Sequence, residues 1–449
     1  MKSIDILGAG SHEVTGSQYL LTANDGSQAL IDFGMFQGDK KLEDLNYQLL
    51  SFQPSALGAV FLTHAHLDHS GRLPLLIYGG YFGKIYMTAP TKELVEIILS
   101  DSARIAMKDP TREPLYTMDE VRKVMGMIQV VNYGIEVKTG SFTAIFRDAG
   151  HILGSSSIEL IDTSSDTKDR IVFSGDLGNT PQSIVKPTQY INNSDYVVME
   201  STYGDSAHPK EDASEVIQYE INKVEEDSGV LLIPVFAIER TQEILHIIHH
   251  LKAEGKIKTG TSVFLDSPMG INATLPYMHF KEFQSNEINN HTNIPFNFEG
   301  LEIIDDSRDS REIINKNNPK VIVAGSGMMS GGRIIHHALN YLPLETTRLL
   351  FVGYQAEETL GRKILEGAQN VTIDGIQVEV KAKIREIKIL SSHADQPRLI
   401  KWLEHIKGVK KVFLTHGEKA QEEELAKKIK SELGIQDVIL PENGKSYEL

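Results

Sequence analysis

The chain of 449 residues contains no cysteine. Disulfide bonds and thiolate metal sites are therefore excluded, and any bound metal must be held by histidine, aspartate and glutamate. The sequence also lacks an apolar run of the roughly 18 residues that a membrane-spanning helix needs. Its opening, MKSIDILGAGSHEV, has no apolar core of the secretory type. We therefore expect a cytoplasmic protein with no membrane partner.

Positive charge is also in short supply, because 61 acidic residues face 45 basic ones and the net charge is −16. This balance argues against a protein that binds nucleic acid mainly by charge. It does not exclude an enzyme that grips phosphates locally, through metals, helix N-termini and a few arginines. The length is sufficient for two or three domains.

The densest set of ligand-type side chains is three histidines and an aspartate within six positions: His64, His66, Asp68 and His69. An extended backbone would send His64 and His66 to the same side. Asp68 then lies near the start of the next element, expected at 73–77, and can face a second point nearby. Imidazole and carboxylate together suit zinc and similar divalent ions. One short loop can therefore serve two adjacent metals.

Two further residues complete a binuclear site. His151 follows an expected strand that ends near Phe146, and Asp176 follows another at 171–174. A carboxylate has two oxygens, so Asp176 can bridge two metals. A single histidine or aspartate after a strand is more often a capping residue than a metal ligand. With the histidine-rich loop at 64–69 present, the metal-ligand interpretation is favoured.

A recurring unit, in which an apolar strand ends in a Ser/Thr-His step, occurs at 60–64, 387–393 and 412–416. Ligands at the carboxyl ends of strands are typical of layered α/β proteins. The N-terminal and C-terminal parts are therefore expected to share one sheet system, with helices at 90–108 and 118–129 outside it.

From about residue 205 the pattern becomes a regular alternation of strands and helices, which predicts a separate domain with a parallel sheet. We expect three segments: a first part of one domain at 1–204, an inserted domain at 205–380, and the C-terminal part of the first domain at 381–449.

Three short stretches narrow the interpretation: Glu-Ser-Thr-Tyr-Gly at 200–204, Ser-Ser-His-Ala-Asp at 391–395 and Thr-His-Gly-Glu at 415–418. With the ligand set above, they make the chain resemble the β-CASP branch of the metallo-β-lactamase superfamily, a family of nucleases. The resemblance covers essentially the whole chain. It implies an α/β fold, an αββα metallo-β-lactamase sandwich with an inserted β-CASP domain whose parallel sheet is flanked by helices.

The family pattern also implies the ligand assignment. One zinc would be held by His64, His66 and His151, and a second by Asp68, His69 and His416, with Asp176 between them. Asp32 matches an outer aspartate that orients a metal-bound imidazole. The metal identity stays open, because His/Asp sites also accept manganese.

The implied chemistry is hydrolysis of RNA. Two metals lower the pKa of a shared water, and the resulting hydroxide attacks phosphorus. The catalytic residues expected are His393, Glu200, Asp68 and Asp176. His393 would protonate the leaving oxygen while Glu200 holds its other ring nitrogen, which gives 5′-phosphate and 3′-hydroxyl products. Within the family, histidine at position 416 favours RNA over DNA.

Substrate grip is expected from the inserted domain. The residues predicted to bind RNA or its phosphates are Ser267, Gly325, Ser326, Gly327, Gly331, Gly332, Arg333 and Arg240. Glycine-rich loops before helices expose N–H groups to anions, although a plain tight turn is the alternative.

Several alternatives stay open at this point. They include a thioester or lactone hydrolase, a DNA hydrolase, and a non-catalytic RNA-binding protein on the same fold. Endonuclease and 5′-exonuclease action on single-stranded RNA cannot be separated by sequence. An apolar stretch at 341–344 is compatible with a homodimer.

Overall fold

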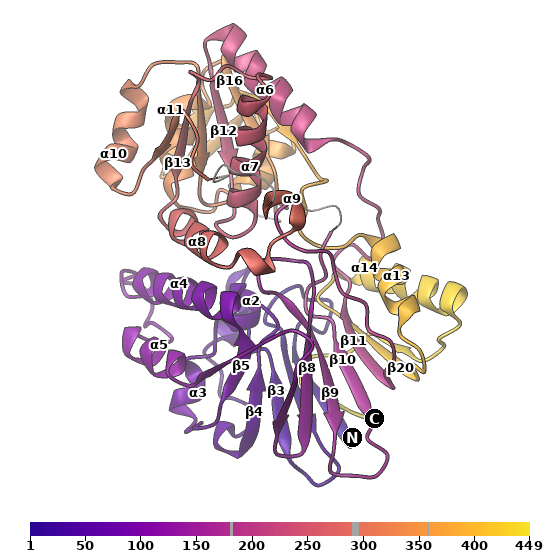
Figure 1. The fold of residues 1–449 in the computed structure, drawn as a ribbon. Helices are drawn as coiled ribbons and strands as arrows, with labels where there is room; N and C mark the ends of the chain where they lie inside the picture. Colours follow the sequence, from indigo (N-terminus) through magenta and orange to yellow (C-terminus); the bar gives the residue numbers. More distant parts are fainter. Residues whose placement is uncertain (180–182, 290–295, 357–358) are drawn as a thin grey trace. The chain divides into compact units, whose positions relative to one another are not determined.

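The computed structural model describes residues 1–449 apart from 180–182, 290–295 and 357–358 (Figure 1). The chain forms two compact units. The first, here called the sandwich unit, joins Met1–Ala207 to His393–Leu449, and the second, the inserted unit, is His208–Ser392. The N-terminal and C-terminal parts of the chain therefore build one unit together.

The sandwich unit contains two seven-stranded sheets. The first sheet, in the order β22-β1-β2-β3-β4-β5-β6, comprises β1 (Ser3–Gly8), β2 (Gln18–Thr22), β3 (Gln28–Ile31), β4 (Leu57–Phe61), β5 (Ile85–Thr88), β6 (Ile128–Val131) and β22 (Lys445–Glu448). The second, in the order β21-β20-β11-β10-β9-β8-β7, comprises β7 (Glu136–Thr139), β8 (Phe142–Asp148), β9 (Ser156–Asp162), β10 (Arg170–Phe173), β11 (Tyr196–Glu200), β20 (Lys411–Thr415) and β21 (Val438–Ile439).

Strand direction decides where the loops gather. Strands β3 and β4 are parallel neighbours in the first sheet, and β10, β11 and β20 are parallel neighbours in the second. The loops that follow parallel neighbours leave a sheet at the same edge, so side chains far apart in sequence meet there.

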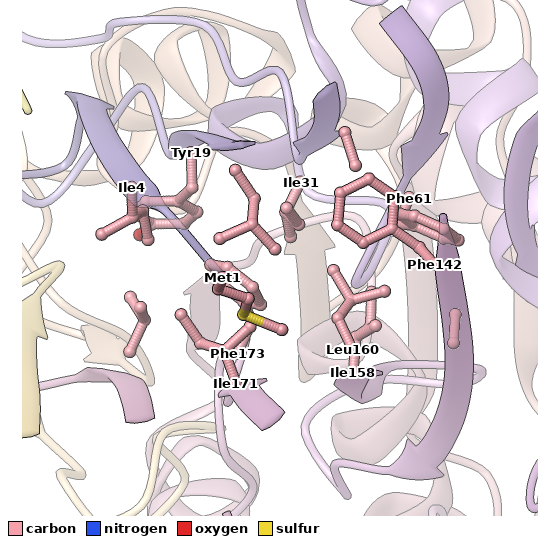
Figure 2. Close-up of a cluster of buried hydrophobic side chains, with 14 of the residues drawn as sticks. Met1, Ile4, Tyr19, Ile31, Phe61, Phe142, Ile158, Leu160, Ile171 and Phe173 are labelled. Atoms are coloured by element: carbon pink, nitrogen blue, oxygen red, sulfur yellow. The ribbon is translucent and has the colours of Figure 1, made fainter. Parts of the chain in front are cut away.

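The core of this unit lies between the two sheets (Figure 2). Alternation of apolar and polar residues in β1 points Ile4 and Ile6 inward, as a strand period of two requires. Phe61 from the first sheet and Leu160 and Phe173 from the second are almost completely buried in the same cluster. Packing of these inner faces holds the sheets together and fixes the edge on which the loops lie.

Helices cover the outer faces of the sandwich. They are α1 (Lys40–Leu45), α2 (Leu67–Ser70), α3 (Leu75–Tyr78), α4 (Ala89–Ala106), α5 (Met118–Met125), α13 (Gln396–His405) and α14 (Lys419–Lys428). Trp402 of α13 and Leu425 of α14 are buried with Met199 and Leu414 of the second sheet. The αββα arrangement expected from the sequence is confirmed.

The inserted unit has a six-stranded sheet of parallel pairings, in the order β14-β13-β15-β12-β16-β19. Its strands are β12 (Val230–Pro234), β13 (Ser262–Asp266), β14 (Leu301–Ile303), β15 (Lys320–Ala324), β16 (Thr347–Phe351) and β19 (Lys383–Glu386), beside a hairpin of β17 (Asn370–Ile373) and β18 (Ile376–Glu379). Its helices are α6 (Ala213–Asp227), α7 (Arg240–Ala253), α8 (Pro268–His279), α9 (Asn286–Asn289), α10 (Ser307–Glu312), α11 (Arg333–Tyr341) and α12 (Leu360–Leu365).

Three details differ from the sequence expectation. The inserted unit ends at Ser392 rather than at residue 380, because β19 adds to its sheet by pairing with β16. The strand expected from residue 387 is not one: the N–H of Ile387 still donates to the carbonyl of Phe351, but β16 ends there and the chain turns away. The helix expected at 118–129 stops at Met125, because β6 begins at Ile128.

None of the helices in the described parts of the chain is both long enough and apolar enough to cross a bilayer.

The inter-sheet core yields a stability prediction. Leu160→Ala should lower the free energy of unfolding by about 2–5 kcal/mol, because it removes buried apolar surface and leaves a cavity. The matched control is Leu49→Ala, since Leu49 is 99% exposed in the same unit. Denaturant unfolding followed by circular dichroism measures both. Equal losses for the two variants would contradict this account of the core.

Candidate metal centre and active site

The predicted ligands come together at one edge of the sandwich. His64 follows β4, His151 follows β8, Asp176 follows β10 and His416 directly follows β20. Asp68 and His69 lie in the short helix α2, just before α3, which is the element expected at 73–77. Among the described residues, three groups of side chains have ligand atoms that all lie within 4.8 Å of one another: His64, His66, His151 and Asp176; Asp68, His69 and His416; and Asp176, His393 and His416. The first two groups contain all the predicted ligands.

Asp176 lies between the two groups. Its Oδ2 is 3.4 Å from Nε2 of His64 and 3.5 Å from Nε2 of His151. Its Oδ1 is 3.3 Å from Nε2 of His69. Nδ1 of His66 completes the first group, at 3.1 Å from the Nε2 atoms of both His64 and His151. Each carboxylate oxygen thus faces a different set of imidazoles.

The second group is closed by residues from opposite ends of the unit. Nε2 of His416 lies 3.2 Å from Oδ2 of Asp68, and its Nδ1 lies 4.0 Å from Oδ1 of Asp176. His416 adopts a φ of 55°. This left-handed conformation is uncommon outside glycine and is held only where surrounding contacts require it.

These residues fit divalent metal ions. Neighbouring ligand atoms in a tetrahedral zinc site lie about 3.3–3.4 Å apart, given metal–nitrogen distances of about 2.0–2.1 Å. The contacts around Asp176 fall close to this spacing, at 3.3–3.5 Å. Oδ1 of Asp176 is also buried and accepts no hydrogen bond from any described residue. A buried, anionic oxygen in that position calls for a cation.

Protonation in the first group also suits metal binding. Burial, together with the neighbouring imidazole of His69, lowers the pKa of His64 to about 4. Burial and His64 lower the pKa of His66 to about 3, and burial and His393 hold the pKa of His151 well below its usual value. The three rings are therefore neutral at pH 7 and each has a nitrogen lone pair to offer.

Asp32 contacts the imidazoles of the site, directly or through Thr63, at the ring nitrogens that do not face Asp176. Its Oδ2 lies 2.7 Å from Nδ1 of His69, and its oxygens accept hydrogen bonds from the N–H and hydroxyl of Thr63, at 2.7 and 2.8 Å. Because the Thr63 hydroxyl donates to Asp32, its oxygen accepts from Nδ1 of His64, at 3.1 Å. Two ligand rings are thus fixed through their second nitrogens, a common arrangement around metals. The structure thus brings Asp32 against His69 and Thr63, and its role in orienting a metal ligand stays a prediction.

Thr202 does the same for His416. Its Oγ1 lies 3.1 Å from Nδ1 of His416 and donates to the carbonyl of the same residue at 3.1 Å. The hydroxyl oxygen then accepts the Nδ1 proton, which leaves Nε2 of His416 to face Asp68. Thr63 and Thr202 were missed from sequence, although each stands within two positions of a predicted site residue.

His393 lies beside the two groups, paired with Glu200. Its Nδ1 is 3.2 and 3.3 Å from the two carboxylate oxygens of Glu200, and 3.9 Å from Oδ2 of Asp176. Burial disfavours a charged ring, but Glu200 and Asp176 outweigh it and raise the pKa of His393 to about 9. The ring is therefore protonated at neutral pH, and its side chain keeps 20% exposure.

The backbone holds this pair in place. His393 forms an isolated antiparallel bridge with Gly178, and the N–H of Leu177 donates to Glu200 at 2.6 Å. A Cβ on Gly178 would lie 1.7 Å from the carbonyl oxygen of Gly150, so only glycine fits there. The loops that carry His151, Asp176 and His393 are thus packed directly on one another.

The residues predicted to bind phosphate lie at the carboxyl edge of the sheet in the inserted unit. Arg333 contacts Asp266 at 2.5 Å and the carbonyl of Ile304 at 2.7 Å, and Arg240 pairs with Glu243. Within the glycine-rich loop, N–H groups donate to other atoms of the same loop, as from Ser330 to Oγ of Ser326 and from Ile334 to the carbonyl of Gly325. Oγ of Ser267 caps α8.

Both arginines and the hydroxyl groups of Ser267 and Ser326 therefore have partners inside the unit. A role in binding RNA stays a prediction for all eight residues: Ser267, Gly325, Ser326, Gly327, Gly331, Gly332, Arg333 and Arg240.

The sandwich fold with a histidine and aspartate cluster at its edge defines a metallo-hydrolase of the metallo-β-lactamase type. Comparison of the sequence with protein families agrees. Residues 13–131 match the metallo-beta-lactamase superfamily, residues 241–364 the Beta-Casp domain, and residues 377–441 the Zn-dependent metallo-hydrolase RNA specificity domain.

Two relatives match most of the chain. Ribonuclease TTHA0252 of Thermus thermophilus is 36% identical over 413 residues, which is 91% of both chains. RNase aCSPSF2 of Saccharolobus solfataricus is 32% identical over 99% of this chain and 85% of its own. The chain therefore belongs to the β-CASP family of metallo-hydrolases.

A solved structure has the same fold at lower similarity. A protein of unknown function from Enterococcus faecalis aligns over 100% of both chains with a TM-score of 0.55 and 14% identity. At that identity the likeness concerns the fold alone.

The Thr202 contact yields a prediction about metal affinity. Thr202→Val should weaken zinc binding by about 10- to 100-fold, the usual effect of removing a partner of a ligand imidazole. Thr202→Ser keeps the hydroxyl and should bind as the unaltered protein does. Competition with a chromophoric chelator measures both affinities. Unchanged affinity in the valine variant would show that Thr202 does not orient His416.

Proposed function

We propose that this protein is a zinc-dependent ribonuclease that holds two metal ions. The observation that carries the proposal is the position of Asp176, whose two oxygens face two separate groups of ligands. The first ion would be held by His64, His66 and His151, and the second by Asp68, His69 and His416, with Asp176 shared. Imidazole-rich sites favour zinc, and manganese is the alternative that the test below includes.

Two such ions would supply a water of lowered pKa and would neutralise charge on a bound phosphate. The protein's own residues do the rest. Nδ1 of His393 is held by Glu200, so Nε2 is the nitrogen that can present a proton to a leaving oxygen. The raised pKa of His393 keeps that proton in place at neutral pH. Departure of the 3′ oxygen with this proton leaves 5′-phosphate and 3′-hydroxyl ends.

RNA is the substrate that the comparisons favour. The match to an RNA specificity domain covers 377–441, which includes both His393 and His416. Relatives named ribonuclease cover most of the chain. A small-substrate hydrolase would need neither His393 nor an inserted unit. We therefore propose single-stranded RNA as substrate and the cytoplasm as the location.

Metal removal tests the proposal. Treatment with a chelator should abolish cleavage of an end-labelled single-stranded RNA, and addition of zinc should restore it. Manganese is added in parallel. Asp176→Asn should lower the bound metal measured by mass spectrometry and should reduce cleavage by several orders of magnitude, because it removes the carboxylate between both groups.

Asp374→Asn is the matched control, since Asp374 is an exposed turn residue in the inserted unit. The label position separates internal cutting from removal of 5′ nucleotides. Full cleavage by protein shown to be metal-free would overturn the proposal.

The Glu200–His393 pair predicts a pH dependence. Because the pKa of His393 is raised to about 9, the proton donor is present at neutral pH and is lost as the pH rises through that value. The cleavage rate should therefore fall on the alkaline side. Glu200→Gln removes the largest influence that favours protonation, so the fall should move to lower pH. His405→Asn, a change of an exposed histidine, should leave the profile unchanged. An identical alkaline limb in the Glu200 variant would refute this role.

A further inference from the structure

An aromatic ring in the inserted unit lies against two glycines. Phe236 follows β12, and its side chain keeps 36% exposure. A Cβ placed on Gly327 would come within 2.7 Å of this ring, and one on Gly353 within 2.9 Å. Any other residue at either position would push the ring away. The backbone of both loops therefore lies close to the Cδ2 and Cε2 atoms of the Phe236 ring.

The glycine loops are tied to each other. Nε2 of Gln355, a buried side chain, donates to the carbonyls of both Gly327 and Gly353, at 3.0 Å each. The carbonyl of Phe236 accepts from the N–H and the hydroxyl of Thr241, at 3.2 and 2.7 Å. The backbone of Phe236 and the two glycine loops are thus held by hydrogen bonds within the inserted unit, which lowers the entropy cost of binding.

The Phe236 ring belongs to a segment at the carboxyl edge of the parallel sheet. Strands β15, β12 and β16 are parallel neighbours, and Gly327, Phe236 and Gly353 follow their carboxyl ends. In open parallel sheets this edge is the usual place for ligands. Tyr354, next to Gly353, is 46% exposed at the same edge. Two partly exposed aromatic side chains therefore follow neighbouring strands.

We propose that Phe236 is a stacking platform for a nucleobase of the RNA. This inference rests on the proposed ribonuclease function and names how part of its substrate is held. A flat aromatic ring that packs against two glycines and keeps 36% exposure matches the face of a base. Such stacking tolerates every sequence. The alternative, binding through the RNA phosphates, is less favoured here, because the side chains of Arg333 and Arg240 are both paired with carboxylates.

Phe236→Trp and Phe236→Leu test the platform in full-length, metal-loaded protein that also carries His393→Ala to prevent turnover. The probes are a short oligouridylate and an abasic oligomer with the same phosphates. Phe236→Leu should weaken oligouridylate binding by roughly 5- to 100-fold, the usual contribution of one stacked base. It should leave binding of the abasic oligomer unchanged. In Phe236→Trp, oligouridylate should quench the new indole, while the native Trp402 is buried and reports little.

Controls separate the possible failures. Phe82→Leu alters a phenylalanine that is 91% exposed in the sandwich unit and should change neither affinity. Thermal unfolding of each variant shows whether the Phe236 substitution only disturbs the fold, and retained affinity in the tryptophan variant shows that a ring is what matters. Equal losses for both oligomers, or no loss for either, would overturn the stacking role. If the unsubstituted protein cleaves no RNA at all, the proposed function fails and not merely this inference.

Discussion

The arrangement depends on one carboxylate. Asp176 is buried, its Oδ2 faces His64 and His151, and its Oδ1 faces His69. Oδ1 accepts no hydrogen bond from any described residue, so without a cation this buried anionic oxygen would be unsatisfied. The nearby charges hold the pKa of Asp176 well below its usual value, so the group is an anion at every pH of interest. An anion in this position makes the edge of the sandwich a cation site.

The second constraint is the close packing of loops. The ligands come from four separate segments, and small errors in any loop would spread the ligand atoms apart. Gly178 allows the loop after β10 to touch the loop that carries His151, and Asp32 and His416 are held with positive φ. Strained backbone of this kind is stable only because the rigid sheets on either side determine it. The inter-sheet core therefore contributes to the chemistry by setting the position of each strand end.

Much of this could be predicted from sequence, because the informative signals were local. The spacing of His64, His66, Asp68 and His69 shows the chemistry directly, and strand patterns place His151 and Asp176 at strand ends. The expectations that were wrong concern boundaries. A strand was expected from residue 387, whereas β19 lies at Lys383–Glu386. Its position depends on pairing with β16, which the local sequence does not encode. Thr63 and Thr202 were missed because a hydroxyl gains its role only from a neighbour brought close by folding.

The sandwich is built from both ends of the chain, with the inserted unit between them. β20 supplies His416 and β22 completes the first sheet beside β1. During synthesis, the residues that precede the inserted unit are made first, and the sheets that they form stay incomplete until these strands have been made. A chain made only as far as the inserted unit therefore lacks His393 and His416 as well as β20 and β22. The metal centre cannot be complete until the segment that follows the inserted unit has joined both sheets of the sandwich.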